Sequence, residues 1–242
     1  MIDFYFAQTP NAAKVLIALK ELGMEYQIKP FDLYQGQHLN AEFRKVNPNL
    51  KIPAIVDLDP TDGGEPIPVF ESAAILIYLA EKGGALIPAD ARRRMEALQW
   101  LSWQVAGLGP YMGQAAHFLR YAPPGPHEYS TERYVKESVR LLHVMDYRLR
   151  SEPFLAGKDY SIADIACFPV VHYFDQYFEF DFQSLDTIKR WYSAILEHPA
   201  VQAALNGPEM DPGRYYDTAP VLTEEEWSNV FGERMLKASM GD

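Results

Sequence analysis

The stretch that decides the fold is IDFYFAQTPNAAKVLIALKELG, residues 2–23. At its start apolar residues occupy alternate positions, Ile2, Phe4 and Phe6, a period of two that predicts a β-strand. Farther on, the apolar residues recur at helical spacing: Ala12, Val15, Leu16, Leu19 and Leu22. Pro10 suits the first turn of a helix and Gly23 suits its end. The stretch therefore predicts a strand that turns directly into a helix, which is how an α/β unit begins.

The residues that follow extend this unit to about residue 84. The apolar runs EYQIKPF (25–31), AIVDL (54–58) and IPVF (67–70) predict three further strands, with a short helical stretch at 41–46. A helix, ESAAILIYLAEKGG (71–84), ends in glycines. The predicted order is βαβ, a linking helix, then ββα.

The second half of the chain has a different period. After the linker ALIPAD (85–90), helical signals dominate, and the clearest is a stripe of Val135, Val139, Leu142, Met145 and Leu149. We therefore predict an α/β domain at 1–84, an all-helical domain at 90–205 and a C-terminal extension at 206–242 with a short helix. In that extension Thr223 and Glu226 form a capping box, and the apolar side chains of Trp227, Val230 and Phe231 predict a helix packed on the body.

Composition excludes several functions. The net charge is -11, and no basic run is longer than Arg92–Arg94, so we expect neither a nucleic-acid partner nor binding to an anionic membrane. No apolar run approaches the ~20 residues that span a bilayer. A single cysteine excludes an internal disulfide, and the start of the chain lacks a signal-peptide pattern, so we expect a cytoplasmic protein.

Three motifs occur in order: NLKIPAIVD (49–57), FESAAILIYLAEK (70–82) and YSIADIAC (160–167). Together with the element order they resemble the soluble glutathione transferase superfamily over residues 1–205. Within it, FAQTPN, GGEPIPVFES and LQWLSWQVAGLGPYMGQ are most similar to the Nu class, a bacterial group related to a yeast nitrogen regulator. The resemblance implies an α/β thioredoxin-like N-terminal domain followed by an all-α C-terminal domain. It further implies a homodimer, glutathione or glutathione disulfide as ligand, and no metal.

The resemblance also implies glutathione-binding residues around the first motif. It gives a cis peptide at Ile52–Pro53, so that the backbone N–H and C=O of Ile52 pair with the cysteinyl part of glutathione. Only ~5–6% of X–Pro bonds are cis, so this expectation depends on the match of the whole motif. Lys51 is placed near the glycine carboxylate, with an ordinary solvated loop lysine as the alternative.

Glu71 and Ser72 open the helix of the second motif. Free N–H groups and the helix dipole favour an anion there. The resemblance implies that the γ-glutamyl carboxylate binds at Ser72 and the ammonium group at Glu71. A serine that merely caps the helix is the alternative.

Three further residues follow from the resemblance. His38 stands where the superfamily has a glutamine on glutathione, with Gln37 adjacent. A histidine can make a similar hydrogen bond and would add pH dependence near its ordinary pKa of ~6.5, unless it is a surface residue without a role. Arg133 matches an arginine that reaches the ligand across the Nu-class dimer interface, although locally it resembles a solvated helix arginine.

The turn at residues 8–11 carries the predicted chemistry. Pro10 has no N–H, so the donors are the Thr9 hydroxyl and the amide groups of Asn11, at the positive end of a helix. We predict that they stabilise the thiolate of glutathione, so that the substrate supplies the sulfur. Tyr5, the rival, is expected to pack against a neighbouring helix, and Cys167 to be a small buried hydrophobe.

The leading function is therefore a glutathione-dependent disulfide-bond reductase. A glutathione S-transferase that conjugates small electrophiles or reduces peroxides is the first alternative. A non-catalytic glutathione-binding interaction module, as in the yeast regulator, is the second. For the second substrate the sequence offers Tyr111, Met112, His117 and Phe118, which are equally candidates for the core or an interface.

Overall fold

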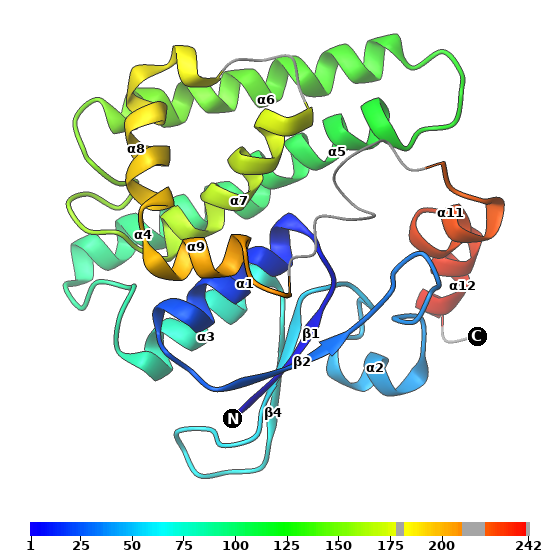
Figure 1. Cartoon of the computed structure of the whole chain (residues 1–242), viewed down its shortest axis with the longest axis horizontal. Coiled ribbons are helices and arrows are strands. Elements are labelled where there is room, and N and C mark those ends of the chain that lie inside the picture. Colours follow the sequence, from blue (N-terminus) through cyan, green and yellow to red (C-terminus); the bar gives the residue numbers. More distant parts are fainter. Residues whose placement is uncertain (178–181, 210–220, 241–242) are drawn as a thin grey trace.

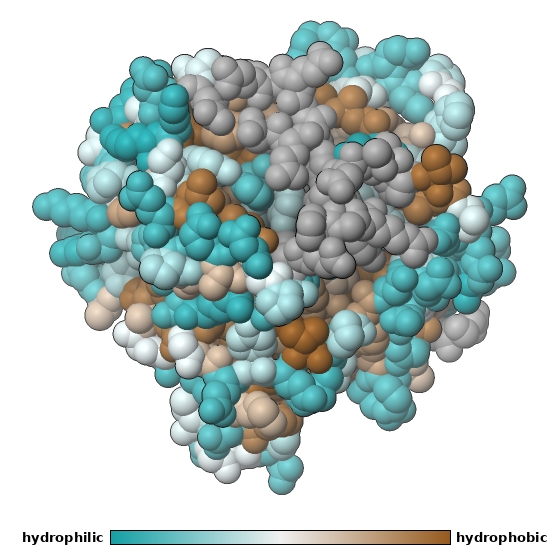
Figure 2. Space-filling view, in the orientation of Figure 1, coloured by the Kyte–Doolittle hydropathy of each residue, from teal (hydrophilic) through white to brown (hydrophobic). Residues whose placement is uncertain are grey.

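A computed structural model describes residues 1–177, 182–209 and 221–240. A small sheet with its helices forms one part of the molecule, and a bundle of longer helices lies across it (Figure 1). The rim of the face shown in Figure 2 is mostly hydrophilic, with smaller hydrophobic patches toward its middle. Within the described residues, no helix combines the length and the apolarity that crossing a membrane requires.

The N-terminal half has the predicted order of elements. Its strands and helices are β1 (Ile2–Phe6), α1 (Pro10–Glu21), β2 (Tyr26–Pro30), α2 (Ala41–Val46), β3 (Ala54–Asp57), β4 (Ile67–Phe70) and α3 (Ser72–Gly83). The four strands lie in the order β2-β1-β3-β4. β1 is parallel to β2, with Phe4 opposite Ile28, and antiparallel to β3, which in turn is antiparallel to β4. This is the thioredoxin-like arrangement that the sequence predicted.

The C-terminal half is helical. Its described elements are α4 (Ala91–Trp103), the π-helix η1 (Gln104–Leu108), α5 (Gly109–Arg120), α6 (Glu128–Leu149), α7 (Ile162–Tyr177), the 3-10 turn η2 (Phe182–Ser184), α8 (Asp186–Leu196) and α9 (Pro199–Leu205). The predicted fold class is confirmed. The π-helix, where α4 runs on into α5, was not predicted, because its hydrogen-bond pattern leaves no periodicity that a short window can resolve.

Helix α1 lies at the centre of the molecule, between the sheet and the helical half (Figure 1). It packs against α3, α7 and α9, so its residues from Ala12 to Leu19 are all buried. Because α1 begins immediately after β1, its first turn is fixed at the boundary between the two halves. That position is where the candidate site lies.

The C-terminal extension folds back onto this body, as the sequence predicted. Helices α11 (Glu224–Val230) and α12 (Glu233–Met240) follow a capping box in which Glu226 N–H donates to Thr223 Oγ1 and Thr223 N–H donates to the Glu226 carboxylate. Trp227 Nε1 donates to the Tyr121 carbonyl at the end of α5, over 3.3 Å. Figure 1 shows the two helices beside the loop that precedes α2.

Candidate active site

The turn between β1 and α1 places two of the predicted catalytic residues. Thr9 is the N-cap of α1, and its Oγ1 accepts from Ala12 N–H over 3.1 Å. A hydroxyl that accepts in this way keeps its own hydrogen to donate elsewhere. Asn11 is exposed in the first turn, where backbone N–H groups have no carbonyl partner inside the helix. The turn therefore presents donors to whatever lies in front of it.

A cavity of about 780 Å³ lies in front of this turn. Its walls come from the start of α1, the loop before α2, the segment before β3, the middle of α5 and the two C-terminal helices. The lining residues are Thr9, Pro10, Asn11, Leu33, His38, Leu50, Lys51, Ile52, Gly113, Gln114, His117, Trp227, Val230, Phe231 and Met235. Five of the predicted site residues are thus brought together on one cavity: Thr9, Asn11, His38, Lys51 and Ile52.

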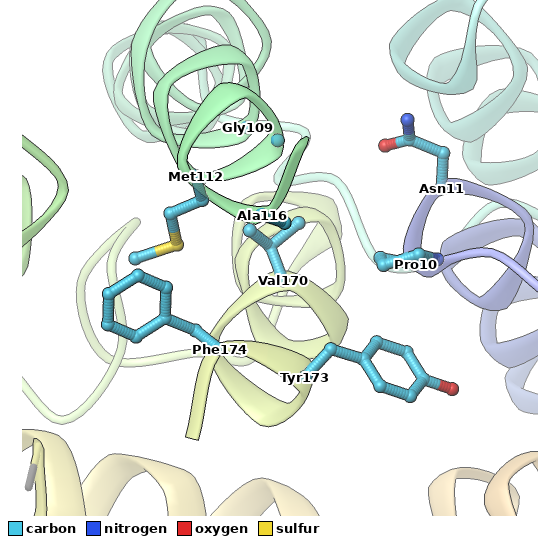
Figure 3. A pocket seen from close by; sticks show the side chains of 9 residues that line it. Pro10, Asn11, Gly109, Met112, Ala116, Val170, Tyr173 and Phe174 are labelled. Carbon is cyan, nitrogen blue, oxygen red and sulfur yellow. The ribbon is translucent and has the colours of Figure 1, made fainter. Parts of the chain in front are cut away.

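Two smaller cavities adjoin it at Pro10 and Gly113. One of about 160 Å³ lies between α5, α7 and the start of α1 (Figure 3). Met112, Tyr173 and Phe174 line it together with Pro10. The other, of about 250 Å³, includes Gln8, Thr9 and Phe231. The start of α1 is therefore a wall of all three cavities.

The peptide bond between Ile52 and Pro53 is cis, as the first motif predicted. Ile52 and Lys51 lie on the large cavity, directly before β3. The Lys51 carbonyl accepts from Asn47 Nδ2 over 2.7 Å, which ties this segment to the end of α2.

Glu71 and Ser72 lie at the start of α3, as predicted. Glu71 occupies the N-cap position without a side-chain cap, and its φ of 68° lies in the left-handed region that a non-glycine residue adopts at a cost. Ser72 is the first residue of the helix and is buried. The alternative in which Ser72 caps α3 is wrong, because the cap position belongs to Glu71. Neither residue lines the large cavity.

His38 differs from the expectation in two respects. It is only 3% exposed, so it is not a surface histidine. Burial, with a smaller contribution from the Lys51 charge, lowers the pKa of His38 from 6.5 to about 4. The expected pH dependence near 6.5 is therefore wrong, since the imidazole is neutral there. Its Nδ1 is buried and has no hydrogen-bond partner among the described residues.

Gln37 and Arg133 lie off the cavity. Gln37 Oε1 accepts from Asp32 N–H over 2.8 Å, which closes the loop before α2. Arg133, on α6, has its guanidinium 3.4 Å from the Glu137 carboxylate and 5.6 Å from the Tyr111 ring centre.

Tyr5, the rival to Thr9 and Asn11, and Cys167 both lie away from the large cavity. The Tyr5 ring packs against those of Phe31 and Phe43, at 5.8 and 5.1 Å, and Tyr5 is not among the residues that line the cavity. Cys167 is 0% exposed, and burial raises the pKa of its thiol well above the ordinary value. The described residues therefore present no protein thiol to the cavity.

Of the four residues that the sequence offered for the second substrate, two line the cavities and two do not. His117 lines the large cavity and Met112 the smaller one, but Tyr111 and Phe118 pack against Tyr134 instead. The C-terminal residues of the lining were not predicted as site residues. Their spacing predicted packing on the body, but a spacing holds no information about which surface receives the helix.

Comparison with known proteins agrees with this geometry. Residues 9–82 match the model of the glutathione S-transferase N-terminal domain, and residues 128–194 match that of the C-terminal domain. The chain belongs to the glutathione S-transferase family.

Among its relatives is the disulfide-bond oxidoreductase YfcG of Escherichia coli, 47% identical over 205 residues that cover 85% of this chain and 94% of the relative. A glutathione transferase of Burkholderia graminis, solved with two glutathione molecules per subunit, is 41% identical with a TM-score of 0.80, covering 87% of this chain and 89% of that one. A Pseudomonas putida transferase, solved with one glutathione disulfide per subunit, is 38% identical with a TM-score of 0.79, covering 86% and 91%.

Proposed function

We propose that this protein is a glutathione-dependent disulfide-bond reductase of the Nu class, in which Thr9 and Asn11 are the catalytic residues. One observation carries the proposal: both residues offer donors to the cavity at the start of α1, while the chain's single cysteine is buried away from it. The disulfide-bond oxidoreductase YfcG and the ligands of the solved transferases support the same reaction class.

The reaction balances with two molecules of glutathione. The first thiolate attacks one sulfur of the substrate disulfide, an S–S bond to glutathione forms, and the other half leaves as a thiolate that takes up a proton. A second glutathione thiolate then attacks the mixed disulfide and releases the remaining thiol. The two glutathione sulfurs are oxidised to glutathione disulfide, and the substrate disulfide is reduced to two thiols.

Interactions with the donors at the turn can supply the free energy that lowering the thiol pKa requires. Lowering a thiol pKa by two units takes ~2.7 kcal/mol. One hydrogen bond to a charged group is worth ~1.5–3 kcal/mol, and a helix N-terminus a further ~0.3–1 kcal/mol. Thr9 and Asn11 together with the α1 dipole therefore suffice to hold glutathione as a thiolate near neutral pH.

The remaining assignments are part of the proposal. Lys51, Ile52 and Pro53 bind the glycine and cysteinyl parts of glutathione, and Glu71 with Ser72 binds the γ-glutamyl part. The open, uncapped start of α3 supports the latter. His38 donates a hydrogen bond to glutathione as a neutral imidazole. Gln37 either binds glutathione beside His38 or holds the conformation of the loop before α2.

We further propose a cytoplasmic homodimer in which Arg133 of each subunit approaches the ligand of the other. The boundaries at 1–84, 90–205 and 206–242 belong to the same proposal, as does the absence of a metal from the reaction. Sedimentation at micromolar concentration is expected to give twice the 27.6 kDa of the chain. A monomer would overturn the assignment of Arg133.

The reaction class is tested with two assays on the purified chain. Bis(2-hydroxyethyl) disulfide and glutathione are followed by coupling glutathione disulfide to glutathione reductase, and 1-chloro-2,4-dinitrobenzene reports conjugation. We expect kcat/KM for the disulfide to exceed that for the chlorobenzene at least tenfold. The opposite order would make the chain a conjugating transferase.

A further inference from the structure

The C-terminal helices and the catalytic turn line the same large cavity. Trp227, Val230, Phe231 and Met235 line it together with Thr9 and Asn11. The first four of these residues lie beyond residue 194, where the match to the family model of the C-terminal domain ends. Part of the wall of this cavity is therefore supplied by a part of the chain outside the family's matched segments.

Rings and neutral groups dominate this wall. The Phe231 ring centre lies 4.7 Å from that of His117, 5.2 Å from Tyr121 and 6.0 Å from Trp227. Burial lowers the pKa of His117, so its imidazole is neutral at physiological pH. The C-terminal part of the lining has no charged residue: it consists of Trp227, Val230, Phe231 and Met235.

Asn229 of α11 and the loop that carries Tyr34 and Gly36 form a latch that holds α11 in this place. Asn229 is 1% exposed, and its Nδ2 donates to the Tyr34 carbonyl over 2.7 Å. Gly36 in the same loop has a φ of 68°, and a Cβ there would lie 2.8 Å from Asn229 Oδ1. The loop before α2 is therefore shaped to receive this side chain. Farther along, Met235 and Ala238 pack against the small cluster around Phe43 and Leu50.

We infer that α11 and α12 form the selective wall of the second-substrate site, which takes disulfides with an aromatic or other flat apolar group beside the reacting sulfur. Phe231 and Trp227 contact that group, and Asn229 and Gly36 are positioning residues that hold the wall. The inference rests on the proposed function for the identity of the sulfur chemistry. Its physical basis is that aromatic rings gain free energy from edge and offset contacts in addition to the area they bury.

Binding of two glutathione thioethers tests the wall without requiring turnover. S-Benzylglutathione places a ring beside the sulfur and S-methylglutathione does not. In isothermal titration of the full chain we expect the benzyl compound to bind about tenfold more tightly, the size expected for one ring site. In Phe231→Ala the ratio should fall toward one, while the affinity for S-methylglutathione stays within twofold.

The chain offers a matched pair for the latch. Gly36→Ala puts a Cβ into Asn229, whereas Gly23→Ala places one at a similar φ of 60° with nothing within 4 Å. Both carry the same kind of backbone strain, but only the first displaces α11. We expect Gly36→Ala to lose the benzyl preference and to exchange the amide hydrogens of 224–230 faster. Gly23→Ala should keep both properties.

The outcomes separate the two proposals. Wild-type protein that binds both thioethers equally, or a Phe231→Ala variant that keeps the benzyl preference, overturns the selective wall even if disulfides are reduced. A benzyl preference that depends on Phe231 and Gly36 supports the wall even if bis(2-hydroxyethyl) disulfide is not turned over, a result that rejects only the reductase. Equal behaviour of Gly36→Ala and Gly23→Ala overturns the latch.

Discussion

Helices α1 and α7 pack against each other, yet they begin in opposite ways. At α1, Thr9 Oγ1 accepts from Ala12 N–H, and Thr9 and Asn11 line the cavity. At α7, the Asp164 carboxylate is fully buried and accepts from Leu155 N–H, Ser161 N–H, Ser161 Oγ and Trp191 Nε1, at 2.9 to 3.1 Å.

The difference shows how one local device serves two purposes. Both helices start with a hydroxyl residue that accepts a backbone N–H. Around Ser161 the protein supplies every partner, so this end of the helix is structural. Around Thr9 a cavity takes the place of protein, so the donors are left for a ligand. Because protein surrounds one helix start and a cavity lies at the other, substitutions should change stability at the first and activity at the second.

The largest effect is expected at the buried end. Asp164→Ala leaves the donors of Leu155, Ser161 and Trp191 in an apolar interior, each at ~1–3 kcal/mol, so the unfolding free energy should fall by roughly 3–5 kcal/mol. Urea unfolding measures the loss. Glu226→Ala, in the capping box at the surface, is the control and should cost about 1 kcal/mol. Equal losses would mean that burial does not distinguish the Asp164 carboxylate from that of Glu226.

At the open end the effect should be on rate rather than stability. Thr9→Ala with Asn11→Ala removes ~1.5–3 kcal/mol of thiolate stabilisation, which corresponds to roughly 10- to 150-fold in kcat/KM for bis(2-hydroxyethyl) disulfide at neutral pH. Cys167→Ser, on α7, should leave turnover almost unchanged because its sulfur is buried and protonated. The reverse result, loss with the serine variant and retention with the double variant, would replace this mechanism by a protein-thiol cycle.

A buried lysine of α1 sharpens the comparison through pH. Lys14 of α1 is 1% exposed and donates to Gln104 Oε1 over 2.8 Å. Burial lowers the pKa of Lys14 from 10.5 to about 7, against smaller opposing effects of Cys167 and Glu71. Between pH 7 and 10.5 the unfolded chain therefore binds more protons than the native one, so stability rises with pH in this window.

Lys14→Met should remove that rise. From pH 7 to 9 the wild-type unfolding free energy should gain about 1–2 kcal/mol more than that of the variant, measured by urea unfolding at both values. Lys45→Met, at a surface lysine paired with Glu42, is the control and should follow the wild type. Parallel curves for wild type and Lys14→Met would show that the ammonium group is not desolvated in the native state.

The smallest effect concerns His38, which also lines the large cavity. With its pKa near 4, the imidazole is neutral from pH 6 to 8 and contributes no titration there. His38→Gln should change the glutathione dissociation constant by a pH-independent factor over this range. A wild-type profile with an inflection near 6.5 that the variant lacks would mean that His38 is hydrated and protonated in solution.

The sequence predicted the elements that depend on neighbours along the chain. The period of two in residues 2–6 and the helical spacing after Pro10 predicted β1 and α1. The cis peptide at Ile52–Pro53 was implied only by the resemblance of its motif to the glutathione transferases. The sequence did not predict properties, such as a pKa, that depend on what surrounds a side chain in the folded protein. The pKa values of His38 and Lys14 come from burial by segments distant in the sequence, so no local pattern contains them.

The sequence by itself determined the two halves of the chain, the turn that presents Thr9 and Asn11, and the helical tendency of residues 224–230, because hydrogen bonding and side-chain periodicity within a few residues settle each of these. Only the tertiary structure decided that Thr9 lines a cavity while Ser161 bonds to Asp164, and that Asn229 docks on Tyr34 while Phe231 lines the same cavity as Thr9. These outcomes depend on contacts between residues as many as 195 positions apart, whose free energy exists only once the core is packed.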